Sequence, residues 1–461
     1  MVKEEFNDLD IDIQEDEDRS KKVKEGLDYN VDQLKKEILK RTTLITDPRT
    51  EQIYIFDGAI WRPDGESFIK DVCTEMLKDK FANFKFNNVV GYIQGRTYKK
   101  MQEPPTNLVC LENGILDLDN MELFPHTRNQ FFLNKLPIYY SKSKTCGKIQ
   151  DFLIQVLNED DIAVFQEYLG YCLYRSYPFA KSLVFIGEGE NGKSTLLEVV
   201  KTFLGKENIS SRSLQEIADN RFAPYDLIGK LANIYADLSD KALIETGKFK
   251  ILTGGDQLTV EQKFKRSQQF VNYAKLMFSC NRLPDTRDDT DAFFRRFILM
   301  TFPNTFTKDK ARKKDDLVKE LTTKDEMSGL LNWALEGLKN LIERGYFINS
   351  ATTEQLREDY IRKASPVRAF FMDCLETSPD EYIPKRDLYN TFCEYCRQKR
   401  YAILSEVTFH EKLRQIVQVI EYKLGGQTRT WKGIKYSQNY LAMIKGSPKY
   451  QKLDEKEEKK P

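Results

Sequence analysis

SLVFIGEGENGKSTLLEVVKTFLG (182–205) joins an apolar strand, a glycine-rich turn and an amphipathic helix. Its centre, GEGENGKS (187–194), has the spacing of a phosphate-binding P-loop. Gly187 and Gly192 let the backbone curl so that amide N–H groups point at phosphates, and the following helix adds its positive dipole end. An accidental glycine loop is the alternative, but the strand before it and the helix after it are the context that a P-loop requires.

The residues of this loop predict how a nucleotide is held. Lys193 supplies a charge to the β- and γ-phosphates, and the Ser194 hydroxyl can ligate Mg²⁺. The sequence therefore predicts an α/β domain that binds ATP with Mg²⁺. The predicted nucleotide-binding residues are Gly187, Glu188, Gly189, Glu190, Asn191, Gly192, Lys193, Ser194 and Thr195.

Two further apolar strands follow the loop. KLANIYADLSD (230–240) ends in acids, of which Asp237 is placed to hold Mg²⁺ or to polarise the attacking water, with Asp240 as second candidate. The alternative for each is an ordinary acid at a strand end. AKLMFSCN (274–281) ends in Asn281, whose amide can orient water near the γ-phosphate. This alternation of strands and helices predicts an α/β core.

Arg295 and Arg296 form a pair in FFRRF (293–297). Paired arginines at such a point are usually solvated charges. In a ring-shaped ATPase, one of them can instead reach the γ-phosphate of the neighbouring subunit as an arginine finger. The sequence alone does not choose between the two.

The order of these segments resembles superfamily 3 helicases, specifically the phage/plasmid primase–helicase group that includes the poxvirus helicase-primase. The similarity is strongest in 182–302, and NGILDL (113–118) resembles the domain that precedes the motor in that group. In one departure from the pattern, Ala236 and Leu238 flank Asp237, so a second adjacent acid is absent and the general base is not assigned. The segments that carry the resemblance are GEGENGKST (187–195), GKLANIYADLSD (229–240), KILTGGDQLTVEQKFK (250–265), KLMFSCNRLP (275–284) and DAFFRRF (291–297).

The resemblance implies an AAA+-like motor that assembles as a homo-hexameric ring with ATP between subunits. It also implies a hairpin that grips single-stranded DNA, which maps to residues 257–276. Independently, two alternating runs flank a basic turn, where positive charge and an aromatic ring suit a phosphate backbone and a base. A solvent-exposed basic turn is the alternative. The predicted DNA contacts here are Lys263, Phe264, Lys265 and Arg266.

The C-terminal region has a helix–helix–helix–hairpin pattern, typical of a winged-helix domain. The helices are predicted at 366–376, 385–401 and 406–417, with Ser405 as an N-cap, and the hairpin at 419–434. Such a domain can bind DNA through its recognition helix and wing, or bind only protein. The predicted DNA contacts are Lys412, Arg414, Arg429 and Lys432.

Cys393 and Cys396 form a CxxC motif that could join Cys374 and His410 in a zinc site. Without a second CxxC, we favour packing of these cysteines on one helix face. The chain has only two histidines, so histidine-centred catalysis is not expected.

Composition limits the class of protein. Lys and Arg total 72 against 71 for Asp and Glu, so any nucleic-acid site must be a local basic patch. The eight scattered cysteines, the acidic N-terminus and the lack of an apolar run of about 18 residues predict a cytoplasmic protein without a membrane segment. The predicted order is an acidic tail (1–21), an N-terminal α+β domain (22–146), a helical segment leading into the motor (147–178), the motor core (179–302), a helical segment (303–350), a winged-helix-like domain (351–440) and a charged tail (441–461).

These features predict an ATP-dependent ring helicase that translocates on single-stranded or forked DNA during replication of a virus, phage or plasmid. A primase or polymerase partner would be a separate polypeptide, since no primase metal cluster stands out. The alternatives are an ATP-switched replication initiator that binds DNA without translocating, and an ATPase that remodels protein.

Overall fold

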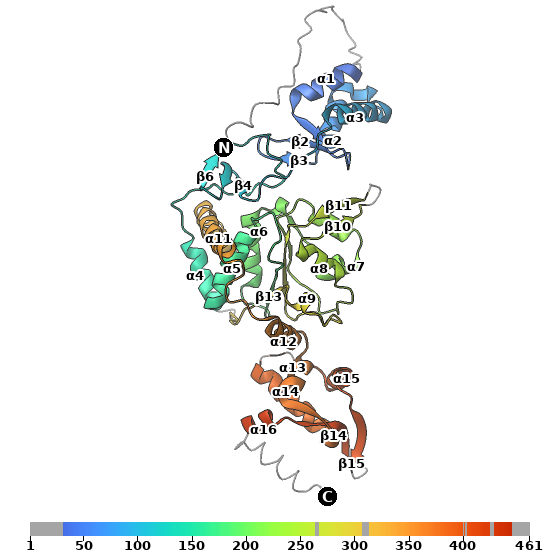
Figure 1. The fold of residues 1–461 in the computed structure, drawn as a ribbon, viewed down its shortest axis with the longest axis vertical. Coiled ribbons are helices and arrows are strands. Elements are labelled where there is room, and N and C mark those ends of the chain that lie inside the picture. The colour runs from blue at the N-terminus through green and yellow to red at the C-terminus, as the bar shows by residue number, and fades with distance from the viewer. Residues whose placement is uncertain are drawn as a thin grey trace, which may run out of the picture. The chain divides into compact units, whose positions relative to one another are not determined.

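The structure is a computed structural model, which describes residues 31–262, 267–306, 313–399, 401, 403–424 and 428–444 (Figure 1). The chain forms two compact units. The first comprises Met1–Asp57 and Arg62–Met101, and the second comprises Gly58–Trp61 and Gln102–Pro461.

The first unit is a small α+β fold. Apolar side chains at helical spacing, such as Leu34 and Ile38 or Ile69 and Val72, form its core between the helices. β1 and β2 pair antiparallel. The elements in this part of the chain are α1 (Val31–Arg41), β1 (Leu44–Thr46), β2 (Ile53–Phe56), β3 (Trp61–Arg62), α2 (Gly65–Leu77), the 3-10 turn η1 (Lys78–Lys80) and α3 (Asn83–Thr97).

An antiparallel sheet of β4 (Leu108–Leu111), β5 (Gly114–Asp117) and β6 (Glu122–Phe124) begins the second unit. Val109 and Leu116 belong to the same hydrophobic core as the parallel sheet that follows in the chain. The predicted N-terminal domain (22–146) therefore includes strands that pack with the α/β core. Because β4 and β5 bury their apolar side chains in the α/β unit, the structural boundary lies near Met101.

Five parallel strands form the centre of the second unit, in the order β13-β7-β12-β9-β8. The predicted α/β core is confirmed. Leu183 and Phe185 of β7 point into one hydrophobic core and Val184 and Ile186 into another, so both faces of the sheet are covered. The strands are β7 (Ser182–Ile186), β8 (Ile209–Ser210), β9 (Ala232–Tyr235), β12 (Lys275–Cys280) and β13 (Phe297–Thr301).

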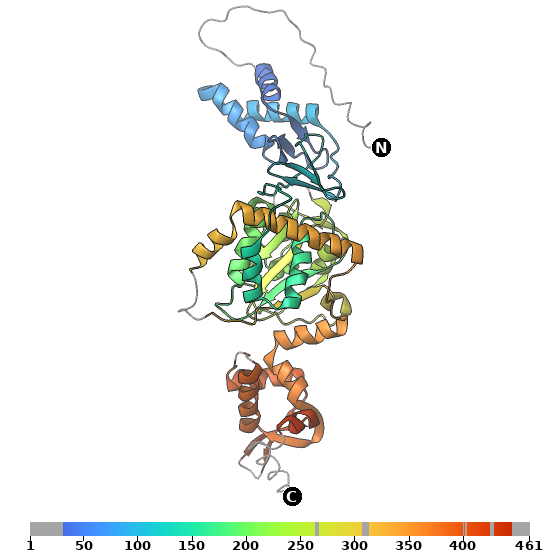
Figure 2. The ribbon, with the colours of Figure 1, turned by 90° about the vertical axis from the view of Figure 1, so that its left-hand side faces the viewer.

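Helices cover the two faces of this sheet (Figures 1 and 2). At Gly337 a Cβ atom would lie 2.7 Å from the carbonyl oxygen of Gln166, so this glycine lets α11 approach α5 closely. The helices that contribute to the first core are α4 (Gly147–Val156), α5 (Glu159–Tyr171), α6 (Lys193–Leu204), α10 (Lys314–Leu321) and α11 (Lys324–Arg344). The second core receives α7 (Leu214–Asp219), α8 (Gly247–Gly254), α9 (Asp291–Phe294) and α12 (Thr353–Ala364), and two 3-10 turns, η2 (Lys206–Asn208) and η3 (Ala223–Leu227), complete the unit.

A hairpin extends the chain between α8 and β12. Its strands β10 (Gln257–Val260) and β11 (Gln268–Val271) pair antiparallel, as predicted for this region. The predicted DNA contacts Lys263, Phe264, Lys265 and Arg266 lie outside the described residues.

Helix α12 packs on the α/β core. The ring of Tyr360 lies 5.0 Å from that of Phe297 and 5.5 Å from that of Phe293, and its hydroxyl donates a hydrogen bond of 3.0 Å to the carbonyl oxygen of Pro284. The predicted C-terminal domain, which starts at residue 351, therefore includes a helix that packs on the α/β core. The boundary lies near Ser365, whose hydroxyl caps the next helix.

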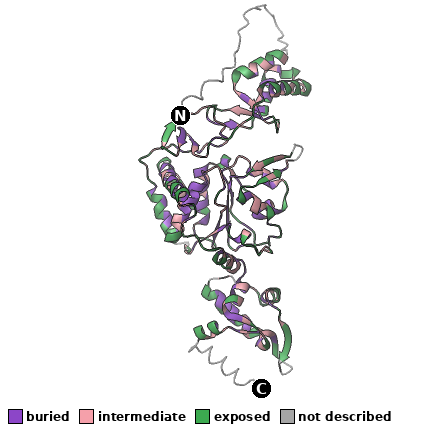
Figure 3. Cartoon of the chain, viewed as in Figure 1, coloured by how far each residue is buried: buried purple, intermediate pink, exposed green. Residues whose placement is uncertain are grey.

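The C-terminal domain combines helices with an antiparallel sheet in the order β14-β16-β15. Its centre is aromatic and buried (Figure 3): Phe392 stacks on Phe409 at 4.4 Å, beside Trp431. β14 was not predicted, because Pro379 and the acids after it interrupt the apolar alternation. The elements are α13 (Pro366–Cys374), β14 (Leu375–Pro384), α14 (Lys385–Lys399), α15 (Glu406–Ile416), β15 (Ile420–Leu424), β16 (Thr428–Tyr436) and α16 (Gln438–Ile444).

Candidate functional site

The loop 187–194 lies between the carboxyl end of β7 and the first turn of α6. The amide of Gly187 donates a hydrogen bond of 3.3 Å to the carbonyl oxygen of Cys280, which ties the start of the loop to β12. Gly192 has a φ angle of +90°, and a Cβ atom there would lie 2.6 Å from Cγ1 of Val156. Both the backbone angle and the lack of space therefore require glycine at position 192.

Lys193 begins α6, and its side chain turns back into the loop. Nζ donates hydrogen bonds to the carbonyl oxygen of Gly187, to that of Glu188 at 3.1 Å and to Oδ1 of Asn191 at 3.2 Å. Lys193 is only 7% exposed, and burial lowers the pKa of its ammonium group. A phosphate at the loop would favour the charged form of this lysine more strongly than these neutral acceptors do.

Asn191 is buried beside Lys193. Its Oδ1 atom accepts hydrogen bonds from Nζ and from the backbone amide of Lys193. Its Nδ2 atom is also buried, and within the described part of the chain it has no hydrogen-bond acceptor. An unpaired buried donor is costly, so this atom fits an acceptor supplied from outside the chain, such as a phosphate oxygen.

A cavity of about 840 Å³ opens beside the loop and is lined by residues 189–195, Asp237 and Asn281. This volume lies within the roughly 300–1,000 Å³ that is usual for small-ligand sites. Parallel strands bring their carboxyl ends to one edge of the sheet, and β12 lies between β7 and β9. The amide of Leu238 donates a hydrogen bond of 2.8 Å to the carbonyl oxygen of Ser279, which holds the segment carrying Asp237 against β12.

The cavity also contains a donor set suited to a divalent cation. Ser194 and Asp237 both line it and offer a hydroxyl and a carboxylate oxygen. Mg²⁺ takes oxygen ligands, usually one or two from the protein together with substrate phosphates. The residues present therefore fit Mg²⁺ bound together with a phosphate.

Another part of the cavity wall was missed from the sequence. The amide of Phe306 donates a hydrogen bond of 2.8 Å to the carbonyl oxygen of Glu190, so this aromatic residue is held at the loop. No local motif marks the wall, because its members come from segments before and after the motor core. They are Lys148, Asp151, Phe152 and Gln155 of α4, Phe306, and Lys314, Leu317, Glu320 and Leu321 of α10.

Three predicted catalytic residues, Asp240, Arg295 and Arg296, are not among the described residues that line the cavity. Asp240 is exposed in the segment after β9. Arg295 and Arg296 immediately precede β13, whose first residue Phe297 pairs with the first residue of β7. They therefore lie at the edge of the sheet away from the loop.

The two arginines differ sharply in their surroundings. Arg296 is buried, and its Nε atom donates a hydrogen bond of 2.9 Å to Oγ1 of Thr253. Arg295 is exposed, and its side chain has no hydrogen bond or ion pair with any residue that the structure describes. Of the pair, only Arg295 is placed to reach another molecule.

The predicted DNA contacts of the C-terminal domain are unequal. Arg414 lies over the Trp431 ring at 4.8 Å and contacts Glu421 at 3.4 Å, so it is engaged within the domain. The other three differ from it in their contacts: Lys412 on α15 is half-buried, Lys432 is 3.8 Å from the exposed Asp380, and Arg429 is exposed and pairs across the strands with Lys423.

The cysteines considered for zinc are packing residues. Cys374, Cys393 and Cys396 are buried in the C-terminal domain, and Nδ1 of His410 accepts a hydrogen bond of 2.9 Å from the Trp431 indole. Across the described ranges, no group of three His, Cys, Asp or Glu side chains could hold a metal ion. No helix in the described ranges has the length and apolar character needed to span a membrane.

The fold and the cavity define an α/β protein with a glycine-rich loop at the end of a central parallel strand, and three family models match the chain. A D5 N terminal like domain matches residues 31–158, a family of unknown function (DUF5906) matches 185–296, and a poxvirus D5 protein-like domain matches 362–445. The predicted resemblance to the group that includes the poxvirus helicase-primase is confirmed by the two D5 matches.

Similar proteins occur in viruses. "Putative helicase 121R" of Invertebrate iridescent virus 3 is 22% identical over 72% of this chain and 39% of its own length. "Putative helicase L207/L206" of Acanthamoeba polyphaga mimivirus is 32% identical over 54% of this chain and 28% of its own length. The chain thus spans about a third of these relatives. Among solved structures, the apo structure of the NrS-1 C terminal region (305-718) is 14% identical with a TM-score of 0.43, covering 87% of this chain and 98% of that one.

Proposed function

We propose that this chain is an ATP-dependent DNA helicase that acts in the replication of a virus, phage or plasmid. One observation carries the proposal: Lys193, Asp237 and Asn281 lie in segments that follow three parallel strands, β7, β9 and β12, and all three line one cavity. The names of the viral relatives and the D5-type domains point to the same class. ATP and Mg²⁺ are the proposed ligands of the P-loop.

The chemistry follows from the residues at the strand ends. Lys193 and the amides at the start of α6 bind the phosphates, and Ser194 and Asp237 would hold Mg²⁺, which adds positive charge at the phosphate oxygens. Asn281 orients a water molecule whose oxygen bonds to the γ-phosphorus. The bond from that phosphorus to the β-phosphate bridging oxygen breaks, giving ADP and inorganic phosphate, and one proton of the water is released to solvent.

Arg295 completes the site of a neighbouring subunit. β7 has five residues, so at about 3.3 Å per residue its ends are roughly 13 Å apart. Arg295 lies near the amino end and the P-loop follows the carboxyl end, so Arg295 serves another copy of the chain. Such sharing fits a head-to-tail ring, and a homo-hexamer is the proposed form.

The DNA-binding elements are the β10–β11 hairpin and the C-terminal domain. The hairpin carries the basic turn predicted from Lys263 to Arg266. In the C-terminal domain, proposed as a winged helix, Lys423 and Arg429 face each other across the β15–β16 pair and Lys432 follows on β16. Single-stranded or forked DNA is the proposed substrate, and a primase or polymerase on another polypeptide is the proposed partner.

Unwinding of a forked DNA duplex tests the proposal. Wild type should displace the strand only with ATP and Mg²⁺, and Lys193→Ala should not. Lys201→Ala is the matched control, because Lys201 lies on the same helix but pairs with Glu198 at 2.9 Å. ATP-dependent assembly on DNA without strand displacement would instead identify a replication initiator.

A further inference from the structure

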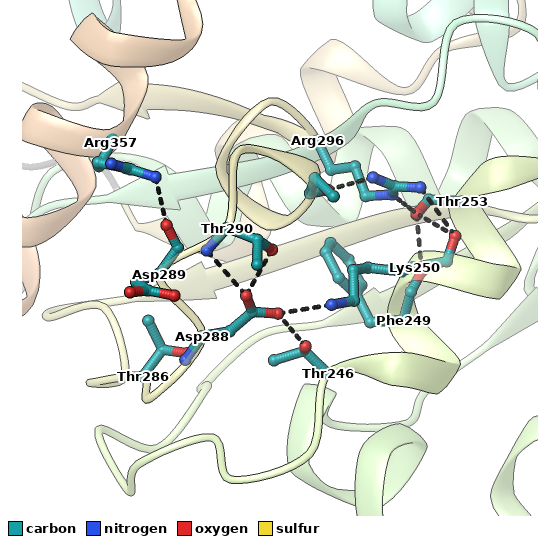
Figure 4. Close-up of polar contacts among 11 residues, drawn as sticks. Thr246, Phe249, Lys250, Thr253, Thr286, Asp288, Asp289, Thr290, Arg296 and Arg357 are labelled. Carbon is teal, nitrogen blue, oxygen red and sulfur yellow. Dashed lines mark hydrogen bonds and ion pairs between the residues drawn. The ribbon is translucent and has the colours of Figure 1, made fainter.

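Arg296 joins the turn that carries Arg295 to the carboxyl end of α8 (Figure 4). Its Nη1 atom donates a hydrogen bond to the carbonyl oxygen of Ala292, within its own turn. Its Nε atom donates to Oγ1 of Thr253 at 2.9 Å and its Nη2 atom to the carbonyl oxygen of Lys250 at 3.2 Å, both on α8. One buried guanidinium therefore holds two segments that are distant in sequence.

Thr253 is the residue of α8 that receives this arginine. It is fully buried, and its hydroxyl donates a hydrogen bond of 2.7 Å to the carbonyl oxygen of Phe249. A hydroxyl can donate one hydrogen bond while it accepts another, so the Thr253 hydroxyl links the Arg296 guanidinium to the backbone of α8.

The same end of α8 anchors both strands of the hairpin. Gly255, with a φ angle of +75°, ends the helix and leads directly into β10. Asn272 directly follows the other strand, β11, and is buried. Its Nδ2 atom donates a hydrogen bond of 3.0 Å to the carbonyl oxygen of Leu252. Any movement of the last turn of α8 therefore moves the base of the hairpin.

The amino end of α8 is tied to α9 as well (Figure 4). The Asp288 carboxylate accepts hydrogen bonds from Thr246, from Nζ of Lys250 at 2.8 Å and from Thr290. Burial alone would raise the pKa of Asp288, but these hydrogen bonds outweigh it and hold the pKa below its usual range. Between the two ends, the ring of Phe249 stacks 5.2 Å from that of Phe297.

We propose that Arg296 and Thr253 are positioning residues that couple the subunit boundary to the hairpin. The inference rests on the proposed function, in which Arg295 senses the nucleotide of a neighbouring subunit. A shift of Arg295 is carried through its neighbour Arg296 to Thr253, through the last turn of α8, and so to the base of β10 and β11. The pair takes no part in the chemistry and is needed for hydrolysis and DNA contact to act together.

Two substitutions of Thr253 separate this role from packing. Thr253→Ser keeps the hydroxyl and loses the methyl group, whereas Thr253→Val keeps a methyl group and loses the hydroxyl. The measured quantity is the ratio of the ATPase rate with single-stranded DNA to the rate without it. Thr253→Val should lower this ratio about tenfold, since it removes a hydrogen bond to a charged group. Thr253→Ser should stay close to wild type, and both should keep the basal rate.

Two further variants complete the experiment. Arg296→Lys retains the charge but not the planar fork that spans Thr253 and Lys250, so it should also lower the ratio. Thr391→Val is the matched control, because Thr391 is a buried threonine whose hydroxyl donates 2.9 Å to the carbonyl oxygen of Asp387 in the C-terminal domain. Thr391→Val should lose about as much thermal stability as Thr253→Val and keep the wild-type ratio.

The outcomes distinguish the inference from the function on which it rests. A wild-type ATPase that DNA does not stimulate would overturn the proposed function. If DNA stimulates the wild-type ATPase and Thr253→Val has the same ratio as wild type, the coupling role alone would be overturned. If the ratio falls in Thr253→Ser but not in Thr253→Val, the coupling would depend on packing of the methyl group and not on the hydroxyl, which would also overturn the inference.

Discussion

The Nζ atom of Lys193 donates a hydrogen bond of 3.2 Å to Oδ1 of Asn191. The asparagine thus holds the lysine within the loop while its own Nδ2 atom, buried, has no acceptor among the described residues. The side chain is arranged to position one cation and to offer one further donor. Both features suit an anion and neither suits an apolar ligand.

Asn191→Asp should weaken ATP binding by about tenfold or more. The change keeps Oδ1 but replaces the free donor with a charged oxygen, which repels a phosphate. Titration with a fluorescent ATP analogue measures the effect. Asn220→Asp, at an exposed helix end, is the control and should bind as wild type does. Equal affinity in both variants would remove Asn191 from the nucleotide site.

Arg295→Ala should abolish most ATP hydrolysis while leaving nucleotide binding intact, because the residue acts only in a neighbour's site. Loss of a finger arginine costs about 10³–10⁵ in rate in other P-loop enzymes. Mixing this variant with Lys193→Ala should restore part of the activity, since some boundaries then combine an intact loop with an intact arginine. Mixtures as inactive as their components would contradict a shared site.

Lys275 should make the stability of the fold depend on pH. This lysine is fully buried, with Nζ donating 2.7 Å hydrogen bonds to the carbonyl oxygens of Tyr174 and Tyr273, and burial lowers its pKa from 10.5 to about 7. At a pH between about 7 and 10.5, Lys275 is therefore more fully protonated in the unfolded chain than in the folded one. The free energy of unfolding should therefore rise with pH in this window, by up to about 1.4 kcal/mol per pH unit.

Urea unfolding of wild type and Lys275→Met across this pH range checks the prediction. The stability of wild type relative to the variant should increase from pH 7 upward, because the variant has no proton to lose at this position. Parallel curves for the two proteins would show that the lysine is not held with a lowered pKa.

Removing basic side chains from the proposed DNA-binding elements should flatten the salt dependence of DNA binding. For every side chain that binds a phosphate, its removal should reduce the slope of log affinity against log salt by about one unit. We expect this for Lys265→Ala in the hairpin and Arg429→Ala in the C-terminal sheet. Arg414→Ala should instead lower the thermal stability of its domain, because this side chain binds Trp431 and Glu421.

Three strands of the central sheet, β7, β9 and β12, were predictable because they are largely buried and read as apolar runs. The same periodicity placed Asp237 and Asn281 at strand ends, and parallel pairing brings them to one edge. Sequence could not separate Arg295 from Arg296, since the difference lies in a partner, Thr253, that is distant along the chain. Phe306 was missed for the same reason.

The packing partner of a helix or strand cannot be read from the sequence of that element alone. Helix α12 has polar and apolar faces like any amphipathic helix, and only the burial of Tyr360 against Phe293 and Phe297 assigns it to the α/β core. Strand β14 contains a proline and two acids in its middle, so its pairing with β16 was not expected.

The ATP hydrolysis rate at saturating Mg²⁺ and ATP, measured with and without a single-stranded oligonucleotide, tests the central claim most directly. We predict an oligomer whose rate rises when the oligonucleotide is added and which loses all hydrolysis in Lys193→Ala. A chain that stays monomeric with nucleotide bound, and hydrolyses ATP at one rate whether or not the oligonucleotide is present, would contradict the account.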